Sequence, residues 1–160
     1  MTENLIRPAS RSDIGQILRF ITDLAIYERE PEAVVATEAM LETALFGDAP
    51  RVFALICEQG GKAVGFAVYF FNFSTWLGTH GIYLEDLYVD PHARGSGAGK
   101  ALLKAVARIA VDNNCGRYEW SVLRWNTPSI EFYEAFGAAP LDEWVGYRLE
   151  GDALQRFALD

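Results

Sequence analysis

Cysteine and histidine are scarce in this sequence, with two of each among 160 residues. Cys57 and Cys115 lie far apart and lack Cys-x-x-Cys spacing, which argues against a zinc motif and a disulfide framework. His80 and His92 have no second Cys, His or carboxylate at ligand spacing, so we expect them to be loop residues. The sequence therefore predicts a protein that needs no metal and that keeps two free, buried thiols.

Long apolar runs and an excess of positive charge are also missing. The longest apolar run, at 63–71, is too short to cross a bilayer, and the first ten residues, MTENLIRPAS, lack the apolar core of a signal peptide. The chain has 14 Lys and Arg against 22 Asp and Glu, a formal net charge of −8. This balance disfavours nucleic acid and anionic membranes and favours cationic ligands. We therefore expect a cytoplasmic protein that binds neither nucleic acid nor membrane.

The sequence does have the material for a hydrophobic core. A hydrophobic share of 51% and an aromatic share of 13%, with no repeat or linker, predict one globular domain over residues 1–160. Turn signals separate its segments at intervals typical of an α/β fold. The predicted order is βααβββαβαβ, with strands at 4–9, 51–58, 63–71, 81–90 and 117–123, helices at 11–27, 38–46, 97–110 and 127–136, and a last strand with a small terminal helix within 145–154.

Polar residues suited to capping precede the first two predicted helices. Ser10, with Asp13 three residues on, has the pattern of a capping box. Thr37 directly precedes the second helix and can accept a hydrogen bond from its first turn. These residues fix where the two helices are expected to begin.

A glycine-rich loop lies where the strand at 81–90 meets the helix at 97–110. A P-loop is disfavoured because Arg94 stands five residues before Gly99 and Ala101 follows Lys100, and the dinucleotide pattern G-x-G-x-x-G fails in both registers. Exposed main-chain amides at a helix N-terminus still favour an anion, and a pyrophosphate fits. The predicted loop comprises Arg94, Gly95, Ser96, Gly97, Ala98, Gly99 and Lys100.

A basic stripe continues along the same helix. Lys100, Lys104 and Arg108 are spaced four residues apart, inside a chain that is acidic overall. The stripe is compatible with an anionic ligand and equally with an ordinary solvated helix face.

The segment VDPHARGSGAGKALL resembles the R-x-x-G-x-[GA] coenzyme A loop of the GNAT superfamily of acetyltransferases. The segments LIRPA, LAIYE, YLEDLYV, WNTPSIEFYEAFGA and YRL resemble its spermidine/spermine acetyltransferase branch. The resemblance spans nearly the whole chain. It implies a central, mostly antiparallel mixed sheet flanked by helices, acetyl-CoA as co-substrate, and a homodimer.

The resemblance also implies roles on the coenzyme side. The strand at 81–90 would offer main-chain partners to the pantetheine arm, and the glycine loop would take the pyrophosphate. Tyr133 stands at the position of the general acid that protonates the departing thiolate, although a tyrosine at this helical spacing is more often a core aromatic. Asn126 is a coenzyme contact or, equally, the cap of the following helix. The implied coenzyme contacts outside the loop are Leu87, Tyr88, Val89, Asn126, Ser129 and Tyr133.

The amine side poses the harder chemical problem. A lysine-like ammonium has a pKa of about 10.4, so releasing the neutral amine at pH 7 costs about 4.6 kcal/mol. Glu85 stands at the position of the base, and we assign it both a water-relayed proton transfer and the orientation of the amine. Glu85 and Asp86 point to opposite faces of a regular strand unless a bulge intervenes, and their apolar neighbours predict burial on both faces. The implied substrate contacts are Tyr27, Glu28, Glu85, Asp86, Glu119 and Trp120, the last of which has a core or interface role as its alternative.

Together these features predict an acetyl-CoA-dependent N-acetyltransferase that acts on the primary amine of a small cationic acceptor, such as a polyamine, a diamine or a lysine-like amine, by direct transfer in a ternary complex. The alternatives are a protein or peptide N-acetyltransferase, a coenzyme A-binding module without turnover, and a nucleoside triphosphate binder. The segment LDEWVGY differs from the vertebrate polyamine enzymes, so the identity of the acceptor stays open.

Overall fold

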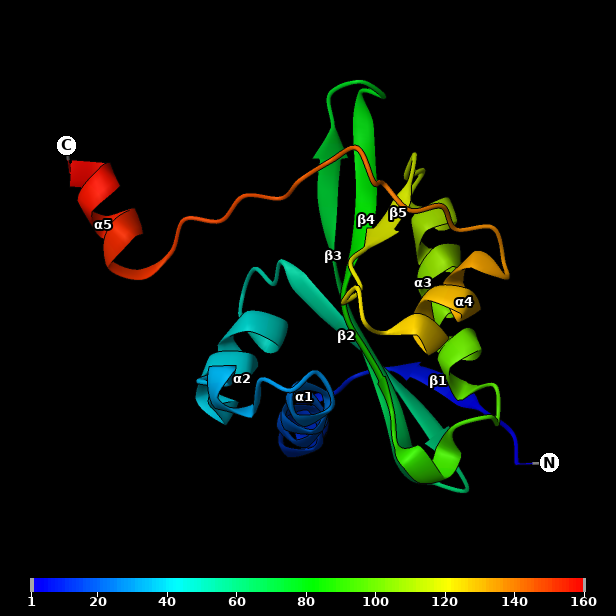
Figure 1. Ribbon diagram of the computed structural model, residues 1–160. Helices are drawn as coiled ribbons and strands as arrows, with labels where there is room; N and C mark the ends of the chain where they lie inside the picture. Colours follow the sequence, from blue (N-terminus) through cyan, green and yellow to red (C-terminus); the bar gives the residue numbers. More distant parts are fainter. Residues whose placement is uncertain (1, 160) are drawn as a thin grey trace. The chain divides into compact units, whose positions relative to one another are not determined.

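A mixed sheet forms the centre of the computed structural model, which describes residues 2–159 (Figure 1). Its five strands lie in the order β1-β2-β3-β4-β5. The first three neighbouring pairs are antiparallel, and β4 and β5 are parallel. This confirms the predicted, mostly antiparallel mixed sheet. The strands are β1 (Leu5–Pro8), β2 (Val52–Gln59), β3 (Lys62–Ser74), β4 (Thr79–Val89) and β5 (Tyr118–Trp120).

Helices cover both faces of this sheet. Helix α1 (Ile14–Tyr27) and helix α2 (Glu38–Phe46) lie on one side, and α3 (Ala98–Asp112) lies on the other (Figure 1). The chain then forms α4 (Thr127–Glu134) and α5 (Gly151–Leu159), and short 3-10 turns occur at Arg11–Asp13, Pro31–Ala33 and Pro91–Ala93. The element order agrees with the prediction from β1 to α4.

The core explains why these segments take up their positions. On the first face, Phe20 of α1 is fully buried with its ring centroid 5.4 Å from that of Phe66 in β3. Phe66, Val68 and Tyr88 belong to this cluster because alternate strand residues face the same side. On the other face, α3 buries its apolar stripe, which includes Leu102, Leu103, Val106 and Ala110.

The predicted helix starts are confirmed, with one refinement. The Ser10 amide donates to Oδ2 of Asp13 at 2.7 Å, and the Met40 amide donates to Oγ1 of Thr37 at 3.2 Å. The first turn after Ser10 is a 3-10 turn, and the α-helix proper begins at Ile14.

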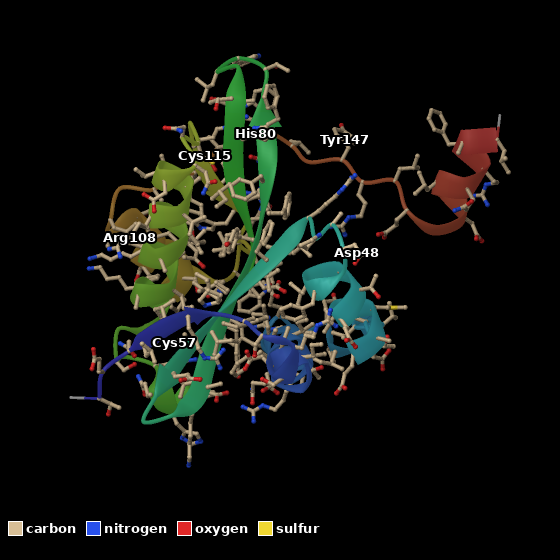
Figure 2. The ribbon with its side chains drawn as sticks, turned by 180° about the vertical axis from the view of Figure 1, so that it is seen from behind. Asp48, Cys57, His80, Arg108, Cys115 and Tyr147 are labelled. Atoms are coloured by element: carbon tan, nitrogen blue, oxygen red, sulfur yellow. The ribbon has the colours of Figure 1, made fainter. Side chains whose placement is uncertain are left out.

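Of the two elements predicted within 145–154, the strand is wrong and the terminal helix is confirmed. Residues 145–150 pair with no strand of the described chain, and the terminal helix α5 follows from Gly151. The side chain of Tyr147 is 97% exposed (Figure 2). An alternating sequence has strand propensity, but it forms a strand only where an edge supplies hydrogen-bond partners.

The histidines and cysteines depart partly from expectation. His80 lies in β4 and not in a loop (Figure 2). Its ring packs edge-on against that of Phe73, with centroids 5.2 Å apart. His92 lies in the short turn after β4. Both thiols are free, with Cys57 buried and Cys115 only half-buried.

The chain divides into two compact units, one reaching to Ser121 and the other starting at Val122. The predicted single domain stays a prediction. Within residues 2–159, no helix has the length and apolarity that a membrane span requires.

Candidate active site

A bulge in β4 shapes the centre of the candidate site. Val68 of β3 pairs with Asp86, but the next β3 residue, Tyr69, pairs with Leu84, so Glu85 is the extra residue. The parallel ladder between β4 and β5 also ends at Leu84, which pairs with Trp120. Beyond that point β4 continues to Val89 with β3 on one side only, and no strand of residues 2–159 pairs with its other edge.

This open edge contains Leu87, Tyr88 and Val89, the residues predicted to face a pantetheine arm. Main-chain groups on such an edge are available to an extended ligand, as in strand addition. The Val89 carbonyl already accepts a hydrogen bond from Nε of Arg94, at 3.1 Å.

The bulge separates the two acidic residues of β4. Asp86 pairs with Val68 and so shares the face covered by α1 and α2, where it is half-buried. Glu85 is exposed, so the expectation that both carboxylates are buried is wrong for Glu85. The reason is geometric, because a bulged residue leaves the regular alternation of the strand.

Asp86 has an unusual electrostatic environment. Burial, followed by the charges of Glu85 and Glu28, raises the pKa of Asp86 to about 6. Burial also raises the pKa of Glu28 above its ordinary value. Two partly buried carboxylates that influence each other form a place where a cation is stabilised.

Glu28 is held at the C-terminus of α1 by a Schellman motif. The Glu30 amide donates to the Ala25 carbonyl at 2.9 Å and the Arg29 amide to the Ile26 carbonyl at 3.1 Å. Arg29 occupies the left-handed position of the motif with a φ of 67°, where glycine is usual. The negative end of the helix dipole lies beside Glu28, so both features favour a cation there.

The remaining predicted acceptor residues divide between the two faces. Glu119 pairs with Tyr83, which shares the α1 face with Phe70, and its carboxylate forms an ion pair with Arg117 at 2.5 Å. Trp120 pairs with Leu84 and so points to the α3 face. The register therefore brings Glu119 to the side of Asp86 and leaves Trp120 on the opposite side.

In the glycine loop, residues 94–97 and Lys100 are exposed, Gly99 is half-buried and Ala98 is buried. Gly95 and Gly97 have φ values of 78° and 85°, which a residue with a Cβ rarely adopts. Gly97 is the N-cap of α3. From Gly97 to Lys100 the amides make no main-chain hydrogen bond within residues 2–159, as expected for the first turn of a helix.

Two residues that the sequence analysis missed hold this loop in place. Asn4 donates through Nδ2 to the Ser96 carbonyl at 3.0 Å. Gln59 donates through Nε2 to Oγ of Ser96 and to Oδ1 of Asn4, both at 2.8 Å. Ser96 in turn donates to the Ala93 carbonyl at 2.5 Å. No local motif signals these contacts, because Asn4 and Gln59 are distant from the loop in sequence.

Arg94 turns away from the loop amides. Its guanidinium carbon lies 5.2 Å from the ring centroid of Tyr27 and 5.8 Å from that of Tyr88. These distances are typical of cation–π contacts. Tyr27, predicted to contact substrate, thus also contacts Arg94 of the glycine loop.

Three further predicted residues lie in the second unit. Asn126 is buried and precedes α4, but its side chain makes no capping hydrogen bond. Ser129 and Tyr133 are half-buried on α4, and the Tyr133 ring packs against Phe132 with centroids 5.7 Å apart. Their approach to the loop and to β4 stays a prediction.

The basic stripe on α3 is solvent-exposed at Lys100, Lys104 and Arg108. Figure 2 shows Arg108 pointing from α3 away from the sheet. Both interpretations of the stripe stay open. Among residues 2–159 no three His, Cys, Asp or Glu side chains are arranged to hold a metal ion.

Comparison with known sequences identifies relatives over the full length. Residues 17–138 match the model of the acetyltransferase (GNAT) family. A thialysine N-epsilon-acetyltransferase of Sus scrofa is 39% identical over 99% of both chains. A spermidine/spermine N(1)-acetyltransferase-like protein 1 of Homo sapiens is 37% identical over 90% of this chain and 22% of its own length.

Solved structures agree on the fold. An integron cassette protein from the mobile metagenome of V. cholerae superposes with a TM-score of 0.81 at 28% identity, covering 98% of both chains. An aminoglycoside N-acetyltransferase in complex with CoA superposes with a TM-score of 0.74 at 19% identity, covering 92% of this chain and 95% of that one.

Proposed function

Because the chain belongs to the GNAT family of acetyltransferases, we propose that it transfers the acetyl group of acetyl-CoA to a primary amine of a small molecule carrying two amino groups. The observation that carries this proposal is the bulge at Glu85, which opens the edge of β4 beside the carboxylates of Asp86 and Glu28. The relatives named above, which act on thialysine or resemble spermidine/spermine acetyltransferases, support a cationic acceptor.

The coenzyme side rests on the loop and the open edge. The amides of Gly97 to Lys100 head a helix of 15 residues, and together with the dipole of that helix they suit a pyrophosphate. Residues 87–89 would receive the pantetheine arm along the unpaired edge of β4. Because Asn4 and Gln59 already brace Ser96, the loop needs little ordering when it binds.

The charges of Asp86 and Glu28 require an acceptor molecule with two amino groups. Carboxylates raise the pKa of an amine that they hold, because they stabilise its charged form. An ammonium ion held by Asp86 and Glu28 is therefore a poor nucleophile. The acceptor needs a second amine that loses its proton nearby, and exposed Glu85 is placed to relay that proton to water.

The transfer itself forms one bond and breaks one. Acetyl-CoA supplies the thioester carbonyl that the neutral amine attacks. The C–N bond forms, the C–S bond breaks, and the departing sulfur takes a proton from the phenol of Tyr133. The amine proton leaves through water at Glu85, and the phenolate of Tyr133 takes a proton back from solvent before the next turnover. No covalent enzyme intermediate is needed, so both substrates bind together.

A matched pair of acceptors tests the proposal. With acetyl-CoA and purified protein, we expect kcat/KM for cadaverine to exceed that for n-pentylamine at least about tenfold, the worth of one charge-assisted contact. Release of free thiol measures the rate, and the panel includes spermidine, putrescine, lysine, thialysine and short peptides. In the same assay Tyr133→Phe should lower kcat about 100-fold, because the general acid is lost.

The panel also distinguishes the alternatives. Equal rates with cadaverine and n-pentylamine contradict a second ammonium site. A peptide as the best acceptor indicates a protein or peptide N-acetyltransferase. Binding of CoA without thiol release for any amine indicates a coenzyme-binding module. Preference for ATP over acetyl-CoA in calorimetry contradicts the coenzyme site.

We further propose that the protein is a cytoplasmic homodimer. Its free thiols suit a reducing compartment. Residues 141–159 expose many apolar side chains, which suits packing against a second copy. These exposed residues are Leu141, Trp144, Val145, Tyr147, Leu149, Leu154, Phe157 and Leu159.

A charged substitution tests the dimer. Val145 is 73% exposed, and Val111 on α3 is 74% exposed. We expect Val145→Asp to shift the sedimentation mass from dimer to monomer, whereas Val111→Asp keeps the dimer. A monomeric wild type, or dissociation by both variants alike, contradicts an interface at residues 141–159.

A further inference from the structure

Arg94 belongs to the coenzyme loop, yet its side chain contacts the residue that precedes the acidic end of α1. The guanidinium lies against the rings of Tyr27 and Tyr88, at 5.2 and 5.8 Å from their centroids. Its Nε also donates to the Val89 carbonyl at 3.1 Å. The side chain is therefore fixed at three points, which is unusual for an arginine in an exposed loop.

These contacts put the guanidinium on the α1 side of the sheet. Tyr88 belongs to the cluster that contains Phe20 of α1, and the two ring centroids are 5.7 Å apart. The loop amides head α3, which covers the opposite side (Figure 1). Arg94 thus extends from the glycine loop, past the end of β4, to the face of the sheet that contains Asp86.

A second arginine joins the same two segments. Nη2 of Arg19 in α1 lies 3.2 Å from Oδ2 of Asp90, which directly follows β4. Helix α1 is thus connected to the segment after β4 by Arg19 from its first half and by Arg94 at its last residue, Tyr27. Glu28 follows Tyr27 directly and is held by the Schellman motif, so a displacement of Tyr27 displaces Glu28.

We propose that Arg94 is a positioning residue that makes the binding of the coenzyme and the binding of the amine depend on each other. This inference rests on the proposed function. A coenzyme on the loop amides stabilises the conformation of residues 94–97 in which Arg94 stacks on Tyr27, and this keeps Glu28 facing Asp86. An amine held by Glu28 stabilises the same arrangement from the other side.

Thermodynamic linkage makes this dependence measurable in either direction. If the amine favours the stacked state of Arg94, it must tighten CoA binding by the same factor by which CoA tightens amine binding. The factor is limited by the strength of the stacking. One partly buried cation–π contact corresponds to about three- to thirtyfold in an equilibrium constant.

The experiment measures the dissociation constant of CoA by calorimetry with and without saturating cadaverine, a pair that cannot react. In the wild type we expect cadaverine to tighten CoA binding about tenfold. Arg94→Gln and Tyr27→Leu should each reduce this factor below about twofold, since each removes the stacking. Tyr27→Phe keeps the ring and should restore most of the factor. Arg51→Gln, at an exposed arginine directly before β2, is the charge-matched control and should keep the factor unchanged.

A double variant separates coupling from damage. Arg94→Gln with Tyr27→Leu should lose no more of the factor than either substitution alone, because both remove one contact. If Arg94→Gln weakens CoA equally with and without cadaverine, Arg94 is a plain ligand of the coenzyme and the inference is wrong. A wild type that binds both ligands independently also overturns it while leaving the proposed function intact. A wild type that binds no CoA refutes the proposed function itself.

Discussion

Asp86→Asn is expected to make the protein more stable at pH 7 while it lowers kcat/KM for cadaverine about 100-fold, the worth of a partly buried charged contact. The two effects have one cause. The carboxylate of Asp86 is half-buried near Glu85 and Glu28, so its charge is unfavourable until a cation arrives. Asparagine removes the unfavourable charge together with the ligand for the ammonium ion.

The sign of the stability change follows from the pKa. Asp86 has a pKa of about 6 in the folded protein against an ordinary value of 3.8, so folding favours its protonated form. This contribution to stability is fully present below pH 3.8 and is lost as the pH rises through 6. At pH 7 the charged group costs on the order of 3 kcal/mol, and the substitution removes this cost.

Urea unfolding from pH 4 to pH 8 measures this difference. The free energy of unfolding of Asp86→Asn should exceed that of the wild type at pH 7, and the two curves should converge near pH 4. Asp48→Asn, at an exposed carboxylate after α2 (Figure 2), should match the wild type in both stability and rate. A destabilised or fully active Asp86→Asn protein contradicts the cation site.

Hydrophobic spacing and turn signals predicted the helices and strands from β1 to α4, and the resemblance to the GNAT superfamily implied the mixed sheet that they form. The apolar positions of 97–110 become the buried stripe of α3, and Leu102 and Val106 are fully buried. The predicted family, fold and amine acetyltransferase activity are confirmed by the family match and the relatives. These successes share a physical origin, since each depends on local periodicity or on residues adjacent in sequence.

The errors and omissions are all non-local. The pattern at 145–150 has strand propensity, but whether an edge receives it depends on the rest of the chain. Glu85 and Asp86 are adjacent in sequence, so a regular strand would point them to opposite faces. The bulge that separates their environments is set by the pairing of β4 with β3. Asn4 and Gln59 reach Ser96 from β1 and β2, and Arg94 reaches Tyr27 in α1. Tertiary contacts of this kind leave no signal in a single sequence.

One side chain, Arg7, links β1 to both the first turn and β2. Arg7 donates to Oδ2 and Oδ1 of Asp13 at 2.7 and 2.9 Å. Its Nε donates to Oε1 of Glu58 at 2.8 Å. The Asp13 side chain is 10% exposed and the Glu58 side chain 19%. Arg7 therefore pairs with two carboxylates that are largely withdrawn from water.

Arg7→Gln should lower the free energy of unfolding by about 3 kcal/mol at pH 7, because it leaves two poorly solvated carboxylates without their cation. Urea unfolding checks the value. The hydrogen bond from Arg7 lowers the pKa of Asp13 from 3.8 to about 2. That contribution to stability is present above pH 3.8 and is lost as the pH falls through 2, so the variant and the wild type should converge in this range.

Arg11→Gln is the matched control, since Arg11 also pairs with a glutamate, Glu42, but both side chains are more than half exposed, at 63% and 51%. An exposed pair contributes little, so the loss should stay below about 1 kcal/mol. Equal losses in the free energy of unfolding for Arg7→Gln and Arg11→Gln would mean that burial does not strengthen the contacts of Arg7. Partial recovery in Arg7→Gln with Asp13→Asn would show that the cost of Arg7→Gln comes from the uncompensated carboxylate, because the double variant no longer buries that charge.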